Sequence, residues 1–355
     1  MKIKMKTLAL GQRKARPDEN KLGFGRVFTD HMLVMFYDAQ RGWHDPEVRP
    51  YAPFSFDPAA MALHYGQAIF EGLKVYRGAD DGIYLFRPMA NLERMNRSAV
   101  RMCMPQLPVA TVFAGLRALL KTDVEWVPRV KGASLYVRPT MVATEAGLGV
   151  RPAKEYVFFI ILSPVGAYYP EGFNPISIFV TDTYVRAVAG GVGEAKTAGN
   201  YAASIMAAVE AQQQGFTQVL WLDARERRFI EEVGTMNIFF VFKDRIVTPP
   251  LSGSILPGIT RDSVLRLLED WGIKVEQRLT TIDEVLAANE HGDLREVFGT
   301  GTAAVVSPVG SLHYRGRDCL INQGQTGELA QRLFHELTAI QHGRAADQHG
   351  WVFRL

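Results

Sequence analysis

Hydrophobic and polar positions in the first half of the chain follow two different spacings. Asn91 to Cys103 places its apolar residues on one stripe and its arginines elsewhere, which predicts an amphipathic helix, and a second helix is expected from about Val109 through Lys121. Ser134 to Ala143 and Glu155 to Ser163 are rich in β-branched and aromatic residues, so both predict strands, the second buried on both faces. These elements predict a compact α+β unit.

The pattern breaks between Pro164 and Pro175, where prolines and glycines cluster as in a linker or crossover loop. We therefore expect a smaller N-terminal domain over residues 1–165, an interdomain loop over 166–176 and a larger C-terminal domain over 177–355.

After this break the chain alternates strands, glycine-rich loops and helices. The expected strands are Ile176 to Thr181, Gln218 to Leu222, the hairpin pair Asn237 to Phe242 and Arg245 to Thr248, and Glu296 to Pro308, interrupted by Gly-Thr-Gly-Thr. The expected helices are Asn200 to Gln214, ended by Gly215, then Ile259 to Trp271 and Gln325 to Gln341. The charged segment Asp223 to Arg228 is typical of a solvated hairpin tip.

Composition narrows the class of protein. The 355 residues suit two domains of ordinary size, and 47% hydrophobic with 22% charged residues exclude a disordered or fibrous chain. A net charge of +3, spread along the chain, is too small to indicate binding to nucleic acid or anionic lipid. No apolar run approaches the roughly 20 residues that span a bilayer, so we expect no membrane partner. Small-molecule chemistry is favoured instead.

The cysteines and histidines give no signal for a disulfide or metal site. The two cysteines, Cys103 and Cys319, lie too far apart to predict a disulfide framework or a CxxC pair, and the N-terminal sequence lacks a signal-peptide core. We therefore expect a reducing cytoplasm. The seven-residue spacing of His335, His342 and His349 favours surface positions near a C-terminal helix, so we expect no metal site.

Lys196 is the first candidate for chemistry because it stands among small residues, in Ala189-Gly-Gly-Val-Gly-Glu-Ala-Lys-Thr-Ala-Gly-Asn-Tyr201. Such a lysine has room for a bulky group bonded to its nitrogen, as in Schiff-base chemistry with a carbonyl compound. A solvated lysine in a flexible loop is an equally good interpretation of this segment alone. A nucleotide phosphate loop is a weaker one, because Ala195 breaks the GxxxxGK[ST] pattern that starts at Gly190.

Two further segments are candidate anion sites. Pro257 and Gly258 precede a helical stretch, so the amides of Ile259 and Thr260 could face an anion at a helix N-terminus. Phe298-Gly-Thr-Gly-Thr adds the Thr302 hydroxyl and amides beside glycine. Each segment alone is more often a simple turn. Lys196, a carboxylate of the segment Glu231-Glu232-Val-Gly-Thr-Met-Asn237 and these two anion sites together nevertheless match a phosphorylated pyridine aldehyde.

The chain as a whole resembles the fold-type IV pyridoxal-phosphate enzymes, specifically the longer branched-chain amino-acid aminotransferases of eukaryotes and many bacteria. The matching stretches are dispersed along the chain from His64 to Ala304. They are His64 to Gly72, Leu85 to Pro88, Ser134 to Pro139, Gly190 to Tyr201, Gln218 to Leu222, Glu232 to Asn237, Ile255 to Gly258 and Val297 to Ala304. The resemblance implies a mixed α+β fold with a smaller N-terminal α/β domain and a larger, β-barrel-like C-terminal domain with flanking helices.

The resemblance also implies roles toward pyridoxal 5'-phosphate. Lys196 would form the Schiff base and shuttle a proton, and Glu232, rather than its neighbour Glu231, would hold a proton on the pyridine nitrogen. Tyr201 would hydrogen-bond the phenolate oxygen. The residues implied to hold the phosphate are Arg94, Ile259, Thr260 and Thr302. Without the resemblance, we would expect Arg94 to be an exposed helix residue beside Arg97 and Arg101.

On the substrate side, the resemblance implies an aromatic pocket for a branched side chain, made by Phe24, Tyr65, Phe70, Tyr136 and Tyr168. The same aromatic residues could also be plain core residues. The α-carboxylate would meet the region of Thr235 and the backbone amides of Ala303 and Ala304, with Arg138 in supporting polar contacts. Some pocket residues would come from the partner subunit of a homodimer. The implied reaction is ping-pong transfer of the amino group of L-leucine, L-isoleucine or L-valine to 2-oxoglutarate, which gives glutamate and a branched 2-oxo acid.

Alternatives remain at this stage. A D-amino-acid aminotransferase or an aminodeoxychorismate lyase would share Lys196 and Glu232 and differ in the pocket, and a noncatalytic nucleotide-binding protein would use the loop that begins at Gly190. One departure from the family stands out, because mammalian relatives carry a CxxC pair where this chain has Ala304 and Ser307. Thiol regulation of that kind is therefore not expected.

Overall fold

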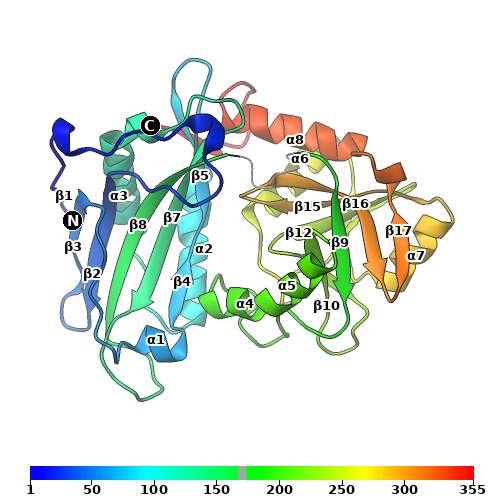
Figure 1. Ribbon diagram of the computed structural model, residues 1–355, viewed down its shortest axis with the longest axis horizontal. Helices are drawn as coiled ribbons and strands as arrows, with labels where there is room; N and C mark the ends of the chain where they lie inside the picture. The colour runs from blue at the N-terminus through cyan, green and yellow to red at the C-terminus, as the bar shows by residue number, and fades with distance from the viewer. Residues whose placement is uncertain (167–172) are drawn as a thin grey trace. The chain divides into compact units, whose positions relative to one another are not determined.

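The computed structural model describes residues 1–166 and 173–355, which divide into two compact units (Figure 1). The first unit contains the described residues up to 166 and two later segments, 195–198 and 339–355, while the second contains 173–194 and 199–338. The boundaries expected from the sequence placed both later segments in the C-terminal domain. Lys196 therefore belongs to the first unit, although it lies far along the chain.

The first unit is built on one mixed sheet of nine strands among its described residues, in the order β1-β3-β2-β8-β7-β5-β6-β18, with β4 paired to β7. The strands are β1 (Lys4–Met5), β2 (His31–Asp38), β3 (Gly42–Pro50), β4 (Ala68–Phe70), β5 (Leu73–Arg77), β6 (Ile83–Phe86), β7 (Ser134–Ala143), β8 (Glu155–Val165) and β18 (Val352–Arg354). The helices are α1 (Met61–Tyr65), α2 (Pro88–Arg101) and α3 (Val109–Thr122), with 3₁₀ turns at Leu10–Gln12, Glu19–Lys21 and Val124–Trp126.

Helices α2 and α3 cover one face of this sheet and form its main core. Leu92 and Met95 of α2 and Leu116 of α3 pack with Leu33 and other strand residues, all almost fully buried. Gly115 allows α3 to approach closely, since a Cβ there would lie 2.7 Å from a Leu33 methyl carbon. The amphipathic spacing predicted for the first helix is thus confirmed, with α2 beginning and ending slightly earlier than expected, and the second expected helix is α3.

The second unit contains a second nine-stranded sheet, in the order β11-β10-β9-β16-β15-β12-β13-β14, with β17 paired to β16. Its strands are β9 (Ile176–Thr181), β10 (Gln218–Leu222), β11 (Ile230–Val233), β12 (Asn237–Phe242), β13 (Ile246–Thr248), β14 (Val275–Gln277), β15 (Leu294–Gly301), β16 (Val305–Tyr314) and β17 (Arg317–Leu320). β11 begins this order, yet a tight turn with a Val233–Met236 bridge joins it to β12, the sixth strand. The sheet must therefore curl back on itself, which gives the barrel-like form expected of the C-terminal domain.

The helices of the second half are α4 (Ala198–Ala203), α5 (Ile205–Gln213), α6 (Ile259–Asp270), α7 (Ile282–Glu290) and α8 (Glu328–Gln341), with a 3₁₀ turn at Asn322–Gly324. The single helix expected over 200–214 is wrong in one respect, because Ser204 separates α4 from α5. Within the described residues, none of the helices combines the length and the apolar character that crossing a bilayer requires.

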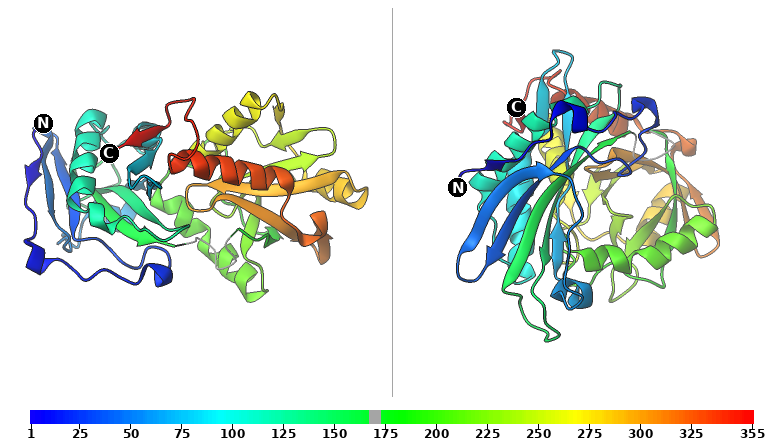
Figure 2. Two further views of the ribbon diagram at one scale, coloured as in Figure 1. Left: turned by 90° about the horizontal axis from the view of Figure 1, so that it is seen from above. Right: turned by 60° about the vertical axis from the view of Figure 1, so that its left-hand side comes forward.

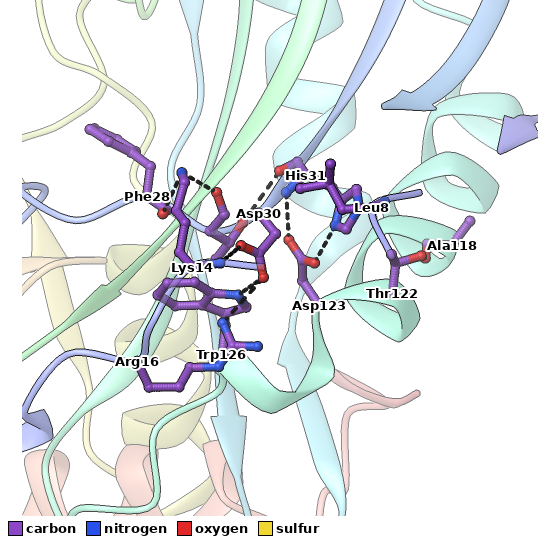
Figure 3. A network of polar contacts seen from close by, with 11 residues as sticks. Leu8, Lys14, Arg16, Phe28, Asp30, His31, Ala118, Thr122, Asp123 and Trp126 are labelled. Carbon is purple, nitrogen blue, oxygen red and sulfur yellow. Dashed lines mark hydrogen bonds and ion pairs between the residues drawn. The ribbon is translucent and has the colours of Figure 1, made fainter. Parts of the chain in front are cut away.

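A buried polar network fastens the N-terminal segment to the first unit (Figure 3). His31 Nδ1 lies 2.6 Å from Asp123 Oδ1, and both side chains are fully buried. His31 Nε2 accepts from the Leu8 N–H at 2.9 Å, so the proton resides on Nδ1, which donates to the carboxylate. Asp30 accepts from the Lys14 N–H and the Trp126 indole, both at 2.8 Å. A long irregular segment is thereby held to the sheet.

The C-terminus completes the same sheet. β18 pairs antiparallel with β6, with Val352 opposite Phe86, and both chain ends belong to the first unit (Figure 2). The Arg87 N–H donates to the Trp351 carbonyl at 2.7 Å and the Leu355 N–H to the Ile83 carbonyl at 2.9 Å. The late strand β18 therefore pairs with the free edge of β6, a strand from the first quarter of the sequence.

Candidate active site

The backbone of Lys196 is held on both sides within the first unit. Its N–H donates to Ser98 Oγ at 2.9 Å, and its C=O accepts from the Phe70 N–H at 3.0 Å. The hydroxyl of the next residue, Thr197, donates to the Ala68 carbonyl at 2.8 Å. The lysine side chain therefore starts from a set position beside β4, and its Nζ lies 5.0 Å from the centroid of the Phe70 ring.

Four residues expected to bind substrate contact one another around this point. Arg138 Nη2 donates to the Tyr136 hydroxyl at 3.1 Å, and the Arg138 guanidinium lies 4.8 Å from the Phe70 ring centroid. Phe24 packs edge-on against Tyr136, with centroids 5.0 Å apart. A Cβ at Gly72 would lie 1.9 Å from the Tyr136 hydroxyl, so glycine leaves room for this ring. The first unit thus gathers an aromatic surface and one cation beside the lysine.

Arg94 is buried, unlike its neighbours Arg97 and Arg101, which are exposed on the same helix. Its Nε and Nη2 donate to the two carboxylate oxygens of Glu71 at 2.7 and 2.8 Å, and Glu71 is fully buried. This pairing fixes the plane of the guanidinium. The exposed position that the sequence favours without the family resemblance is therefore wrong. Ser98, which holds Lys196, lies one helical turn further along α2.

One expected pocket residue lies apart from these contacts, and another is not described. Tyr65 lies at the end of α1, is 39% exposed and donates its hydroxyl to the Leu148 carbonyl. Tyr168 lies outside the residues that the structure describes.

The second unit contains a pocket lined by eight residues. Three residues of its lining, Tyr201, Glu232 and Thr235, are expected site residues. The rest of the lining is formed by Arg186, Asn200, Ser204, Gly234 and Leu256. The structure therefore brings the expected ring-nitrogen partner, the expected phenolate partner and one expected substrate residue to a single pocket.

Glu232 and Glu231 are adjacent and buried, but their partners differ. Glu232 Oε2 lies 2.5 Å from Arg186 Nε, and its Oε1 accepts from Asn237 Nδ2 at 3.0 Å. Glu231 accepts from the Ser254 hydroxyl, and burial raises the pKa of its carboxyl above the usual value. Direct pairing with a guanidinium favours the carboxylate form of Glu232. This difference supports the choice of Glu232, rather than Glu231, as the group that holds a proton on a pyridine nitrogen.

Arg186 also ties together two loops beside this carboxylate. Its Nη2 donates to the Gly193 carbonyl at 3.1 Å and to the Ser254 carbonyl. The loops approach so closely that a Cβ at Gly193 would lie 2.3 Å from the Ser254 oxygen. Asn200 adds a further tie by donating to the Val192 carbonyl at 2.8 Å.

The expected phosphate residues of the second unit lie at a helix start and at a turn. Gly258 is the N-cap of α6, so Ile259 and Thr260, both buried, form its first turn. Thr302 lies between β15 and β16, followed by Ala303 and Ala304. The sequence predicted a single interrupted strand over 296–308. The structure instead has an antiparallel hairpin, because the chain reverses at residues 302–304.

The residues present fit a phosphorylated pyridine aldehyde. The pocket of the second unit has a buried carboxylate held by Arg186, beside the Tyr201 phenol, and such a carboxylate suits a protonated ring nitrogen. A helix start with buried first-turn residues suits a phosphate. In the first unit, a half-buried lysine with a fixed backbone suits bonding to an aldehyde.

Comparison with known proteins agrees with this chemistry. The family model of class IV amino-transferases matches residues 68–312, more than half of the chain. Branched-chain-amino-acid aminotransferase 2 of Bacillus subtilis is 55% identical over 340 residues, which cover 96% of this chain and 94% of that protein. A probable branched-chain-amino-acid aminotransferase of Streptomyces coelicolor is 52% identical over 334 residues, with 94% and 92% covered.

Solved structures show the same fold. The branched-chain amino acid aminotransferase of Escherichia coli aligns with a TM-score of 0.73 and 26% identity, covering 91% of this chain and 98% of its own. The T.th. branched-chain amino acid aminotransferase, solved with pyridoxamine 5'-phosphate, aligns with a TM-score of 0.75 and 27% identity, covering 94% and 98%. The chain therefore belongs to the branched-chain-amino-acid aminotransferases within the class IV aminotransferase family.

Four residues that contact the candidate site were not assigned a role from the sequence: Glu71, Ser98, Arg186 and Asn237. Glu71 and Asn237 stand inside stretches that match the family, which was a usable signal. Ser98 and Arg186 carry no such signal. Ser98 meets Lys196 across 98 positions of sequence, so only the folded chain reveals the contact.

Proposed function

We propose that the chain transfers the amino group of L-leucine, L-isoleucine or L-valine reversibly to 2-oxoglutarate, with pyridoxal 5'-phosphate as its cofactor. The observation that carries the proposal is the buried Glu232 carboxylate, held by Arg186 in a pocket that Tyr201 and Thr235 also line. Membership of the branched-chain-amino-acid aminotransferases supports the choice of substrates.

The cofactor, when bound, supplies an electron sink for the charge that develops at the substrate α-carbon. Glu232 holds a proton on the ring nitrogen, and Tyr201 donates to the phenolate oxygen. Lys196 Nζ would take the proton from the substrate α-carbon and pass it to the C4′ carbon of the cofactor. The phosphate is held by Arg94, Thr302 and the first turn of α6 at Ile259 and Thr260.

The substrate side chain is received by aromatic residues, which suits leucine, isoleucine and valine because their side chains are apolar. Phe24, Phe70 and Tyr136 make this surface in the first unit, with Arg138 in supporting polar contacts. The α-carboxylate meets Thr235 and the amides of Ala303 and Ala304. Tyr65 and Tyr168 complete the aromatic set that the family resemblance implies.

The nucleotide-binding alternative finds less support. A phosphate loop presents its backbone amides to the ligand at the start of a full helix. The N–H of Lys196 instead donates to Ser98, and α4 has only 6 residues. The amine of Lys196, rather than its backbone, is therefore the group suited to chemistry.

Absorption spectroscopy tests the cofactor assignment. Purified protein saturated with pyridoxal phosphate should absorb visible light, and borohydride should bleach it and leave the cofactor attached to the peptide that contains Lys196. The Lys196→Ala variant should bind the cofactor reversibly, show no covalent attachment and lose turnover. Steady-state transamination by this variant would contradict the proposal.

Substrate profiling tests the reaction. L-leucine, L-isoleucine and L-valine should serve as amino donors with 2-oxoglutarate as acceptor, while D-alanine and aminodeoxychorismate should not react. Turnover of either of these two compounds in preference to the L-amino acids would replace the proposal with one of the other activities known for this fold.

The proposal extends to a homodimer that acts in the cytoplasm. Light scattering of the purified protein should give twice the mass of one chain, and fractionation of cells that produce it should recover it with the cytoplasmic enzymes. A monomeric mass with full activity would contradict the dimer.

A further inference from the structure

We infer that Asn237 is a positioning residue, which holds the ring-nitrogen end and the phosphate end of the cofactor site at a fixed spacing. The inference rests on the proposed function, because it takes Glu232 as the partner of the ring nitrogen and the start of α6 as part of the phosphate site. Asn237 itself touches neither the substrate nor the cofactor in this scheme.

The amide nitrogen of Asn237 reaches both ends. Nδ2 donates to Glu232 Oε1 at 3.0 Å and to the Leu256 carbonyl at 3.0 Å. An asparagine has two such N–H groups, so the pair of bonds uses both. Leu256 comes three residues before Ile259, the first residue of α6. One buried side chain, 5% exposed, thus joins the carboxylate to the loop that leads into the helix.

The amide oxygen of Asn237 packs against the same loop. A Cβ built on Gly258 would lie 1.9 Å from Asn237 Oδ1, so the amide occupies the space beside that glycine. The φ of Gly258 is −69°, a value that any residue adopts. Contact with Asn237, rather than backbone conformation, therefore requires glycine at this position.

The backbone of Asn237 anchors this contact to the sheet. Asn237 is the first residue of β12 and pairs with Thr300 of β15, two positions before Thr302. The side-chain amide of Asn237 therefore projects from the sheet, and both the Glu232 carboxylate and the loop before α6 bind to it. Because the amide is neutral, its loss would disturb the spacing of the two ends without removing a charge, which distinguishes it from Arg186.

The test compares the affinities of three ligands for the cofactor-depleted full-length chain. Pyridoxal lacks the phosphate, and 1-deazapyridoxal phosphate has C–H in place of the ring nitrogen. The dissociation constant of pyridoxal divided by that of pyridoxal phosphate measures how much the phosphate contributes to binding. The dissociation constant of the deaza compound divided by that of pyridoxal phosphate measures how much the ring nitrogen contributes. Partial unfolding affects all three ligands equally, so the ratios report on positioning rather than on stability.

Asn237→Ala should lower both ratios about tenfold, since each ratio depends on charge-assisted hydrogen bonds whose geometry the amide sets. Gly258→Ala should lower both in the same direction, although it removes no hydrogen-bonding group, because its methyl group displaces the Asn237 oxygen. Gly11→Ala is the matched control, since a Cβ there meets no atom within 4 Å and both ratios should stay unchanged.

Ratios that stay unchanged in Asn237→Ala, or in Gly258→Ala if the first variant does not fold, overturn the inference. Glu232→Ala separates this result from a failure of the proposed function. If Glu232→Ala keeps the wild-type preference for the ring nitrogen, the assignment of Glu232 is itself wrong. If Glu232→Ala loses that preference while Asn237→Ala and Gly258→Ala keep it, only the positioning role fails.

Discussion

Each unit buries a cluster of charged side chains, and the two clusters have different surroundings. In the first unit, both oxygens of Asp123 accept from His31, and both oxygens of Asp30 accept from Lys14, Arg16 and Trp126. In the second unit, both oxygens of Glu232 are also bonded, yet the side chain lines a pocket. Burial and pairing alone therefore do not mark a functional site.

The two clusters differ in the parts of the chain that supply their hydrogen-bond donors. The donors to Asp30 and Asp123 come from the N-terminal segment, β2 and the 3₁₀ turn at Val124–Trp126, which the network joins, so the network serves stability. The donors to Glu232 hold one carboxylate in the lining of a pocket. Four substitutions, taken from the largest expected effect to the smallest, separate these two roles.

Glu232→Ala should have the largest effect, on rate. Transamination per folded molecule should fall about 10³-fold at saturating cofactor, as when a charge-stabilising partner is removed from an active site. Steady-state kinetics, corrected for the folded fraction by circular dichroism, measure this. A rate within threefold of wild type would place Glu232 with the structural carboxylates.

Asp123→Ala should affect stability instead. The substitution removes two hydrogen bonds from a buried carboxylate to His31, so the free energy of unfolding should fall by about 3 kcal/mol, with the rate per folded molecule unchanged. Urea denaturation measures it. Asp318→Ala is the matched control, because Asp318 pairs with His313 at 2.6 Å while 83% exposed, and its removal should cost no more than about 1 kcal/mol.

Gly193→Ala should have an intermediate effect on the second cluster. Its methyl group would meet the Ser254 oxygen at 2.3 Å, and both loops bonded to Arg186 would have to shift. Overpacking of this kind costs about 2 kcal/mol. The melting temperature and the affinity for the cofactor should both fall. Unchanged values would show that the loops accommodate a side chain.

Glu231→Gln should have the smallest effect, visible only in its pH dependence. Burial raises the pKa of Glu231 in the folded protein, so folding favours its protonated form. The stability that protonated Glu231 contributes is fully present below the usual pKa near 4.5. It is lost as the pH rises through the pKa of Glu231 in the folded protein. The variant cannot ionise, so its stability relative to wild type should increase from about pH 4.5 upward in urea denaturation. A constant difference across this range would contradict the raised pKa.

Strands with continuous β-branched or aromatic runs were predictable from the sequence. The predicted ranges of β7, β9, β10 and β12 coincide with the observed ones, because these central strands carry their own hydrophobic signal. β18 pairs across 266 positions and has only 3 residues, so no local pattern marks it. The reversal at residues 302–304 was missed for a related reason, since glycine and threonine suit both a bulge and a turn.

The candidate site was predictable only where one segment carries the chemistry. The glycine-rich surroundings of Lys196 and the helix start at Ile259 can be recognised locally. The partners that hold these groups are encoded elsewhere: Glu71 meets Arg94 across 23 positions, and Arg186 meets Ser254 across 68. Such contacts depend on sheet register and loop packing, which no single window of sequence contains.

The pairing of β18 with β6 has a consequence for synthesis of the chain. The first unit cannot finish its sheet until its last residues have left the ribosome, although most of it is made first. Until then β6 exposes an unpaired edge for the time needed to translate 266 further codons. Nascent chains stalled before Val352 should therefore aggregate more readily than the finished chain, through the open edge of β6.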